Sequence, residues 1–151
     1  IHHETHSGAY LTQSLKNIED TGIMINGKLS KELLINIFEH NTPLHDGAIV
    51  IEADTIIAAT CYLPLSSNMS ISKALGTRHR AALGISEVTD ALTIVVSEET
   101  GGISIAKSGE LKRIKDGKEL RAILAELNTT TVSKQRFGFL RGSRSNERND
   151  N

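Results

Sequence analysis

The spacing of apolar and polar positions predicts strands that alternate with helices from residue 22 onward. Apolar residues follow helical spacing over 33–38, after Ser30, which is a suitable N-cap. The apolar runs 47–51 and 55–62 are separated by a short polar turn and predict a β-hairpin. The first of these runs is almost wholly apolar, which is typical of a strand covered on both faces.

The second half of the chain continues the alternation. A helix is expected from Thr77, which can cap it, to about Glu87. Three strands are expected next, at 91–97, 103–106 and 111–114. The last helix begins with a capping-box-like pair, Asp116 and Glu119, and continues with apolar residues at i, i+3, i+4 and i+7. The whole pattern predicts an α/β fold, a single domain with a central mixed, twisted β-sheet flanked by helices.

The composition narrows the class of protein. Hydrophobic residues make up 38% of the 151-residue chain and tryptophan is absent, so the core must be aliphatic. A net charge of −1 argues against a nucleic-acid binder that relies on global charge. The single cysteine, Cys61, lies in an apolar run and is expected to be a buried hydrophobe, which fits a reducing compartment.

Three regions are predicted: an N-terminal segment over 1–20, the main domain over 21–132, and a basic, disordered tail over 133–151. The tail holds five cations against two carboxylates, a net charge of +3, whereas the remaining residues carry −4. Such a tail can keep the protein in solution or contact an acidic membrane surface. No run in the sequence approaches the ~20 apolar residues of a membrane span. The chain begins at Ile1 and not at Met, so we expect the natural protein to be longer.

Asp46 is the first candidate for chemistry, because it lies at the mouth of a predicted strand, where α/β folds bind ligands. Its carboxylate could bind a divalent metal, accept a proton from a hydroxyl, or do both. Gly47 follows it and lets a ligand approach the backbone closely. The alternative is an ordinary Asp-Gly turn with no chemical role.

A polar and cationic cluster, Thr77-Arg78-His79-Arg80, opens the helix expected after residue 76. Helix starts have unpaired N–H groups and a partial positive charge, and the Arg guanidinium suits phosphate oxygens. Cations in a first turn oppose the helix dipole, and this conflict favours a bound anion at the position. A solvated run of charges is the alternative.

A third element is the turn over 97–102, Ser-Glu-Glu-Thr-Gly-Gly, which places two carboxylates at the end of another predicted strand. One of them could complete a metal site with Asp46, or the turn could simply be solvated. Tyr62 and Leu63, at the end of the hairpin, could offer a flat surface to a nucleotide base or form the rim of the core. Because strand ends at one edge of a sheet converge, these signals together predict a metal–nucleotide site.

These residues resemble the diadenylate cyclase (DAC) domain. Residues 41–48, Asn-Thr-Pro-Leu-His-Asp-Gly-Ala, carry the family's Asp-Gly-Ala motif, and residues 76–82 carry its Arg-His-Arg motif. Residues 97–101 match a third landmark, and 32–38 look like the membrane-anchored housekeeping type of Firmicutes. The resemblance covers about residues 21–127, and the motifs in this order are specific to the family.

The resemblance implies an enzyme, a nucleotidyltransferase that condenses two ATP molecules into the second messenger cyclic di-AMP and releases two pyrophosphates. Members of the family need a divalent metal, Mn²⁺, Mg²⁺ or Co²⁺, and each subunit holds one ATP. Two subunits must meet face to face, so a homodimer or higher homo-oligomer is expected. No nucleic acid is expected as a partner.

The family's site residues carry over by position. Asp46 corresponds to the catalytic carboxylate, near the 3′-hydroxyl and the metal, and His45 and Glu99 to further metal ligands. The ATP-binding residues that the resemblance implies are Asp46, Gly47, Tyr62, Leu63, Gly76, Thr77, Arg78, His79, Ser97 and Glu98. Arg80 is left open, because it could point away and form a structural pair.

The chain departs from the family pattern before Thr21-Gly22-Ile23, where the interval after residues 7–11 is shorter than in family members. A deletion, or residues absent from the numbering, would explain this, and it affects one wall of the nucleotide pocket. The branch implies membrane helices before Ile1, a parent protein at the cytoplasmic face of the cell membrane, and this chain as a soluble piece. It also implies a membrane-bound regulator and phosphoglucosamine mutase as partners.

Three activities compete for these residues. The first is the metal-dependent cyclase. The second is a non-catalytic module that binds ATP or the cyclic dinucleotide, and the third is a metal-dependent phosphohydrolase that yields AMP or ADP. The intact Asp46 argues against the second activity, and the paired nucleotides of the family argue against the third.

Overall fold

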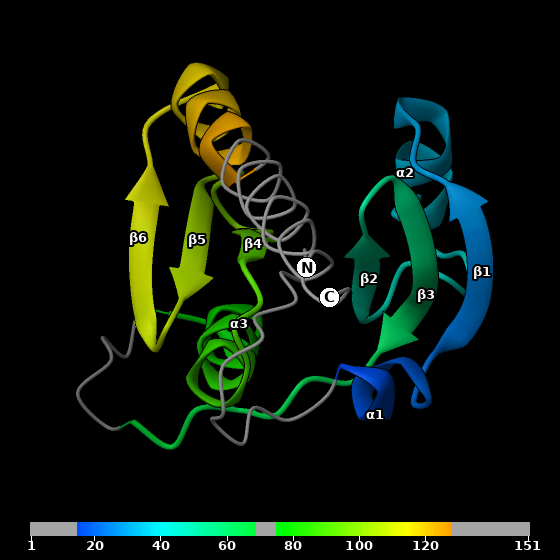
Figure 1. The fold of residues 1–151 in the computed structure, drawn as a ribbon, viewed down its shortest axis with the longest axis horizontal. Coiled ribbons are helices and arrows are strands. Elements are labelled where there is room, and N and C mark those ends of the chain that lie inside the picture. Colours follow the sequence, from blue (N-terminus) through cyan, green and yellow to red (C-terminus); the bar gives the residue numbers. More distant parts are fainter. Residues whose placement is uncertain (1–14, 69–74, 128–151) are drawn as a thin grey trace, which may run out of the picture. The chain divides into compact units, whose positions relative to one another are not determined.

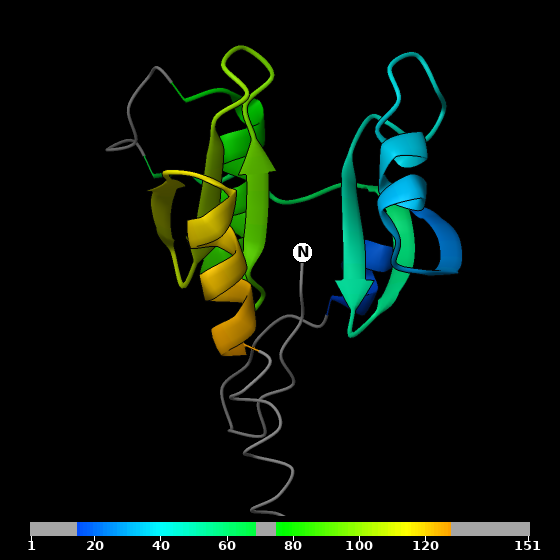
Figure 2. The same cartoon turned by 90° about the horizontal axis from the view of Figure 1, so that it is seen from above.

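The computed structural model describes residues 15–68 and 75–127 and has a mixed α/β fold (Figures 1 and 2). Its elements are α1 (Lys16–Glu19), β1 (Ile23–Lys28), α2 (Lys31–Ile37), β2 (Ala48–Glu52), β3 (Thr55–Cys61), α3 (Thr77–Val88), β4 (Thr93–Val96), β5 (Ile103–Lys107) and β6 (Glu110–Ile114). A further helix follows over 117–127. The predicted α/β class is therefore confirmed. The chain divides into two compact units, Ile1–Arg113 and Ile114–Asn151.

The first sheet has β3 as its central strand, antiparallel to both β1 and β2. β2 and β3 form the predicted hairpin, whose turn has Ala53 at a φ of 52°. The Leu29 N–H donates to the Asp54 carbonyl (2.7 Å), which holds the end of β1 against this turn. α2 begins at its predicted cap, where Ser30 Oγ accepts a hydrogen bond from the Leu33 N–H (3.2 Å).

Apolar clusters cover both faces of this sheet. One cluster contains the buried residues Ile37, Ile49, Ile56 and Ala59. The other contains Leu15, Ile18, Val50, Ala58, Cys61, Ile85 and Ala91. The neighbours Ile49 and Val50 belong to different clusters, as expected when successive side chains point to opposite faces of a strand. The prediction that β2 is covered on both faces is therefore confirmed.

The second sheet, β4-β5-β6, packs against α3. β4 pairs antiparallel with β5, and Ala82 of α3 forms a buried cluster with Val95 and Ala106 of these strands. β5 and β6 are joined by Ser108 and Gly109, whose φ angles of 52° and 77° are those of the two-residue turn that matches strand twist.

The strands form two three-stranded sheets, which differs from the single mixed sheet predicted. The two-residue turns after β2 and β5 can join only antiparallel neighbours. α3 leads from β3 in one sheet to β4 in the other, so it creates no parallel strand–helix–strand pair. The alternation of strands and helices along the sequence therefore overstated the parallel character of the fold.

The sequence pattern predicts neither α1 nor β1. β1 is irregular, because its register shifts between Met24 and Gly27 and Asn26 has a φ of 50°. This bulge breaks the alternation of side chains by which a strand is recognised in a sequence. Leu15 and Ile18 pack into the core, so the core reaches into the segment predicted over 1–20.

The predicted tail over 133–151 lies outside the described residues. Among the helices in the ranges that the structure describes, none has both the length and the apolar character needed to cross a membrane.

Cys61 gives a test of how well the core is closed. Burial, with a smaller contribution from the charge of Glu19, raises the pKa of its thiol from 9.0 to about 11. At pH 8 the thiolate fraction is then about 100-fold lower than at the ordinary pKa, so an aromatic disulfide reagent should react at least that much more slowly with the folded chain than with the unfolded chain. The native rate should keep rising with pH until about pH 11. Equal native and unfolded rates at pH 8 would show that the core opens readily.

Candidate functional site

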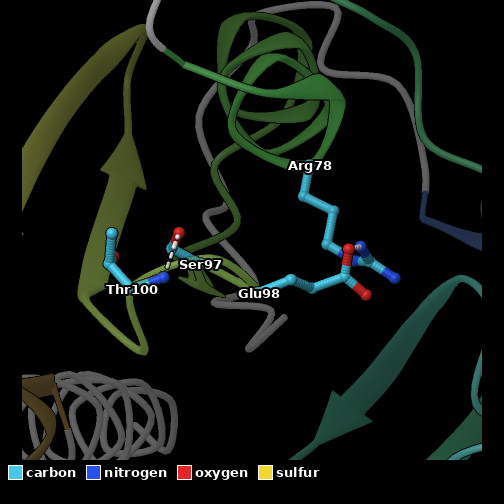
Figure 3. A network of polar contacts seen from close by, with 4 residues as sticks. All are labelled: Arg78, Ser97, Glu98 and Thr100. Carbon is cyan, nitrogen blue, oxygen red and sulfur yellow. Dashed lines mark hydrogen bonds and ion pairs between the residues drawn. The ribbon is translucent and has the colours of Figure 1, made fainter.

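Arg78 and Glu98 form an ion pair that joins two of the predicted motifs (Figure 3). Arg78 lies in the first turn of α3, and Glu98 lies in the turn between β4 and β5. The side chains are 44% and 59% exposed, so the pair contributes at most about 1 kcal/mol to stability. It shows that the start of α3 and the acidic turn lie side by side on the surface.

The acidic turn, residues 97–102, is closed by its own backbone. The Ser97 N–H donates to the Gly102 carbonyl (2.9 Å), and the Gly101 N–H donates to the Ser97 carbonyl (2.8 Å). The Thr100 N–H also donates to Ser97 Oγ (3.3 Å), as Figure 3 shows. Glu98 and Glu99 are both exposed within this compact turn. The Glu98 carboxylate pairs with Arg78, and the Glu99 carboxylate is open to solvent.

The start of α3 corrects one prediction. Gly76 is the N-cap and makes no side-chain capping bond, so Thr77 is the first helical residue and does not cap the helix. The Gly76 carbonyl accepts hydrogen bonds from the N–H groups of His79 (3.1 Å) and Arg80 (3.3 Å). By helix geometry the N–H groups of Thr77 and Arg78 have no partner inside the helix. A Cβ on Gly76 would meet no atom of the described residues within 4 Å beyond its chain neighbours, so the space that they leave beside this backbone is open.

Asp46 and Gly47 lie at the open end of the β2–β3 hairpin, beside Tyr62. This follows from the pairing of Ala48, the first residue of β2, with Cys61, the last residue of β3. Asp46 is exposed. The structure therefore brings the predicted carboxylate and the predicted base-binding residues to the same end of one hairpin.

Packing within the protein requires glycine at position 47, whether or not a ligand approaches it. Its φ is 125°, and a Cβ at this position would lie 2.7 Å from the Cα and carbonyl carbon of Thr60. Thr60 itself has a φ of 57°, which is uncommon for a β-branched residue. The loop that carries Asp46 thus sits directly on a bulged part of β3. The sequence suggested close approach of a ligand, but it did not reveal this contact within the protein.

His45 is held by the loop that precedes Asp46. Its Nδ1 lies 2.7 Å from the Thr42 carbonyl oxygen, and its ring makes an edge contact with the ring of His40 at 5.7 Å between centroids. A carbonyl oxygen only accepts hydrogen bonds, so Nδ1 carries a hydrogen, and in the neutral ring the lone pair lies on Nε2. His45 therefore has one nitrogen suited to bind a metal.

Tyr62 is 74% exposed, although its backbone is fixed. Its N–H donates to Thr21 Oγ1 (2.9 Å), and the next residue, Leu63, packs against the core cluster around Val50. Thr21 thus connects the N-terminal part of the chain to the predicted adenine site. The sequence does not reveal this role of Thr21, because a contact over 41 residues leaves no local signal.

The predicted metal ligands His45, Asp46 and Glu99 do not form a preformed metal site. Within the described part of the chain, no group of three or more His, Cys, Asp or Glu side chains is placed to hold a metal ion. His45 and Asp46 are neighbours in sequence, whereas Glu99 lies in the acidic turn. A cation would therefore need oxygen ligands from another source, as Mg²⁺ takes them from substrate phosphates.

Arg80 is not placed with Arg78 at the predicted phosphate-binding site. Its Nη2 donates to the Ser66 carbonyl (3.0 Å), in the coil that follows β3. The structural role that the sequence left open for this residue is the one observed.

The family described as "DisA bacterial checkpoint controller nucleotide-binding" (DAC) matches residues 4–111. The chain is 58% identical over 128 residues to a Bacillus subtilis protein named cyclic di-AMP synthase CdaA, a match that covers 83% of this chain and 46% of that protein. It is 62% identical over 116 residues to a Listeria monocytogenes diadenylate cyclase, with 76% and 42% covered. The chain thus spans less than half the length of these two relatives.

Solved structures also resemble the chain. A double mutant of DacA from Staphylococcus aureus superposes with a TM-score of 0.73, is 52% identical, and is matched over 76% of each chain. A Bacillus cereus protein described as a hypothetical membrane spanning protein gives a TM-score of 0.66 and is 44% identical, with 69% of this chain and 51% of that chain covered.

Replacing Gly47 tests the packing of the Asp46 loop. Gly47→Ala forces a side chain into the Thr60 backbone at a φ of 125°, so we expect the free energy of unfolding to fall by about 2 kcal/mol or more. Gly101→Ala is the matched control, because its φ is 66° but its Cβ would meet no atom of the described part of the chain within 4 Å. The control should lose only about 1 kcal/mol in urea denaturation. Equal losses would contradict a packing role for Gly47.

Proposed function

Because the chain belongs to the diadenylate cyclase (DAC) domain family, as its motifs predict, we propose that it is the catalytic part of an enzyme that condenses two ATP molecules into cyclic di-AMP and releases two pyrophosphates. The observation that carries the proposal is the ion pair between Arg78 and Glu98. It places an Arg guanidinium, which suits phosphate oxygens, beside the Glu98 carboxylate at the start of a helix. Phosphoryl transfer depends on such electrostatic positioning more than on covalent chemistry by the protein.

The first turn of α3 would bind the ATP phosphates. Unpaired N–H groups and the positive end of the helix dipole favour an anion there, and Arg78 and His79 add side-chain donors. The open space at Gly76 allows a phosphate to reach the backbone. Glu98 holds Arg78 in an exposed pair, which a phosphate can replace at little cost.

The adenine would lie on Tyr62 and Leu63. Tyr62 offers an exposed aromatic ring on a fixed backbone, which supplies stacking area with few bonds left to immobilise. Ser97 lies in the acidic turn beside the phosphate-binding residues. The nucleotide would thus extend from the hairpin end to the start of α3.

Asp46 would accept the proton of the attacking 3′-hydroxyl. In each of two equal steps, a bond forms between the 3′-oxygen of one nucleotide and the α-phosphorus of the other. The bond from that phosphorus to the oxygen bridging to the β-phosphate breaks, and pyrophosphate leaves with the electron pair. The hydroxyl proton passes to the exposed Asp46 carboxylate.

A divalent cation, Mn²⁺, Mg²⁺ or Co²⁺, would neutralise charge on the phosphates. Asp46 and Glu99 offer carboxylate oxygens and His45 offers Nε2, a donor set that suits these cations. The phosphates of ATP would supply the remaining ligands, since the described residues hold no group of three.

Two chains would be needed for one turnover, because each contributes one nucleotide. The two identical displacements are related by a twofold axis if the chains meet face to face. For the parent protein we propose a membrane anchor at the cytoplasmic face, with a membrane-bound regulator and phosphoglucosamine mutase as partners. These proposals rest on the family resemblance, and the Bacillus cereus neighbour described as membrane spanning agrees with an anchor.

A product assay tests the reaction. Chain incubated with ATP and Mn²⁺ should yield cyclic di-AMP and pyrophosphate in a ratio of one to two, resolved by anion exchange. Asp46→Asn should lower the rate by at least about 100-fold without loss of fold, because the amide cannot accept the proton. Asp54→Asn, in the turn of the same hairpin, removes an equal charge away from the site and should leave the rate unchanged.

Other products would identify the competing activities. ATP binding without turnover under all three metals would favour a non-catalytic module, and AMP or ADP would favour a phosphohydrolase. Absence of both cyclic dinucleotide and pyrophosphate at every protein concentration would overturn the proposal.

Dilution tests the need for two chains. Below the concentration at which chains associate, activity per milligram should fall about in proportion to protein concentration, because the fraction of paired chains falls. Sedimentation at the same concentrations measures that fraction directly. Constant specific activity in samples that sediment as monomers would contradict a reaction centre shared by two chains.

A further inference from the structure

The coil after β3, residues 62–68, is fastened to the side of α3. Arg80 makes both backbone contacts to Ser66: its Nη2 donates to the Ser66 carbonyl (3.0 Å), and its own carbonyl accepts from the Ser66 N–H (2.9 Å). In Figures 1 and 2 this coil leaves β3 and passes across one side of α3. One residue of the helix thus satisfies both backbone polar groups of one residue of the coil.

Further contacts make this attachment tight. Ser66 is only 1% exposed, and its Oγ donates to Glu87 Oε1 (2.6 Å) while it accepts from the Asn68 N–H (3.1 Å). At Gly84 of α3, a Cβ would overlap the Pro64 carbonyl oxygen and would lie 2.7 Å from the Ser66 nitrogen. The helix and the coil therefore touch backbone to backbone.

The two arginines of the motif leave α3 in different directions. Residues 78 and 80 are about 200° apart around a helix, so their side chains leave from nearly opposite sides. Arg78 reaches the acidic turn at Glu98, and Arg80 reaches the coil at Ser66. One arginine is placed to meet phosphate, whereas the other is committed to the backbone of the coil.

We propose that Arg80 is a positioning residue that fixes the base-binding coil to the phosphate-binding helix. The coil carries Tyr62 and Leu63, and it is held at its start by Thr21 and at its end by Arg80. Arg80 would thereby hold the coil in the conformation that binds the adenine, without touching the nucleotide itself. The inference rests on the proposed function, because it takes the coil to be the adenine site.

Ligands with and without phosphates separate this role from phosphate binding. We would measure dissociation constants of the whole chain by calorimetry or NMR titration for 3′-deoxy-ATP, 3′-deoxyadenosine and tripolyphosphate. The deoxy compounds lack the attacking hydroxyl, so no turnover occurs. In Arg80→Lys, which keeps the charge, and in Arg80→Met, both adenine compounds should bind about tenfold more weakly, by the same factor, since the lost interaction serves the base. Tripolyphosphate binding should not change.

Arg78→Met is the matched comparison and should show the opposite pattern. Binding of 3′-deoxy-ATP and tripolyphosphate should weaken, whereas binding of 3′-deoxyadenosine should not. Ser66→Ala keeps Arg80 and its carbonyl partner but removes the Oγ contacts to Glu87 and Asn68. Ser66→Ala should weaken the binding of both adenine compounds equally, by a smaller factor than the Arg80 variants, and leave tripolyphosphate binding unchanged. If thermal melting shows that the Arg80 variants do not fold, Ser66→Ala takes their place in the test.

Each alternative result has a distinct meaning. A loss in the Arg80 variants that includes tripolyphosphate, or is larger for 3′-deoxy-ATP than for 3′-deoxyadenosine, would overturn the assignment and make Arg80 a phosphate binder. Unchanged affinity for all three ligands would overturn it as well. If the wild-type chain binds neither adenine compound, the proposed function fails, whatever Arg80 does.

Discussion

The close contact between Gly84 of α3 and the coil at Pro64 and Ser66 is the constraint on which the rest of the site depends. A backbone can lie this near to a helix only where the helix has no side chain. Because the coil lies flat against α3, Arg80 reaches the Ser66 carbonyl and Ser66 becomes buried. The same helix packs Ala82 against the second sheet and Ile85 into the core beneath the first. α3 thus connects both sheets to the residues at its own start.

The two arginines of the motif have the same side chain but different roles, because their surroundings differ. Arg78 is paired with an exposed carboxylate, and solvent weakens such a pair enough for a ligand anion to replace it. Arg80 is bonded to a carbonyl oxygen of a buried residue, which would lose its partner if the guanidinium left. Arg78, whose partner a ligand can replace, and Arg80, which is held by the backbone of the coil, therefore lie two residues apart.

Local patterns predicted most elements and the motifs, because capping, turn chemistry and periodicity act within a few residues. α2 with its Ser30 cap and the β2–β3 hairpin follow the predicted bounds within one to three residues. β1 escaped prediction, since its bulge at Asn26 breaks the alternation. Contacts over long separations also left no signal: Thr21 with Tyr62, Gly47 with Thr60, and Arg80 with Ser66.

The bulges of β3 determine which face of the sheet each of the following side chains occupies. Seven residues of β3 stand opposite five of β2, and each extra residue reverses which face the following side chains occupy. After the second extra residue, near Thr60, Cys61 falls inside the core and Tyr62 falls outside it. The exposure of the aromatic ring is thus set by the parity of the strand's length. Loss of a single residue here would exchange the surroundings of a thiol and a phenol while leaving the composition of the strand nearly unaltered.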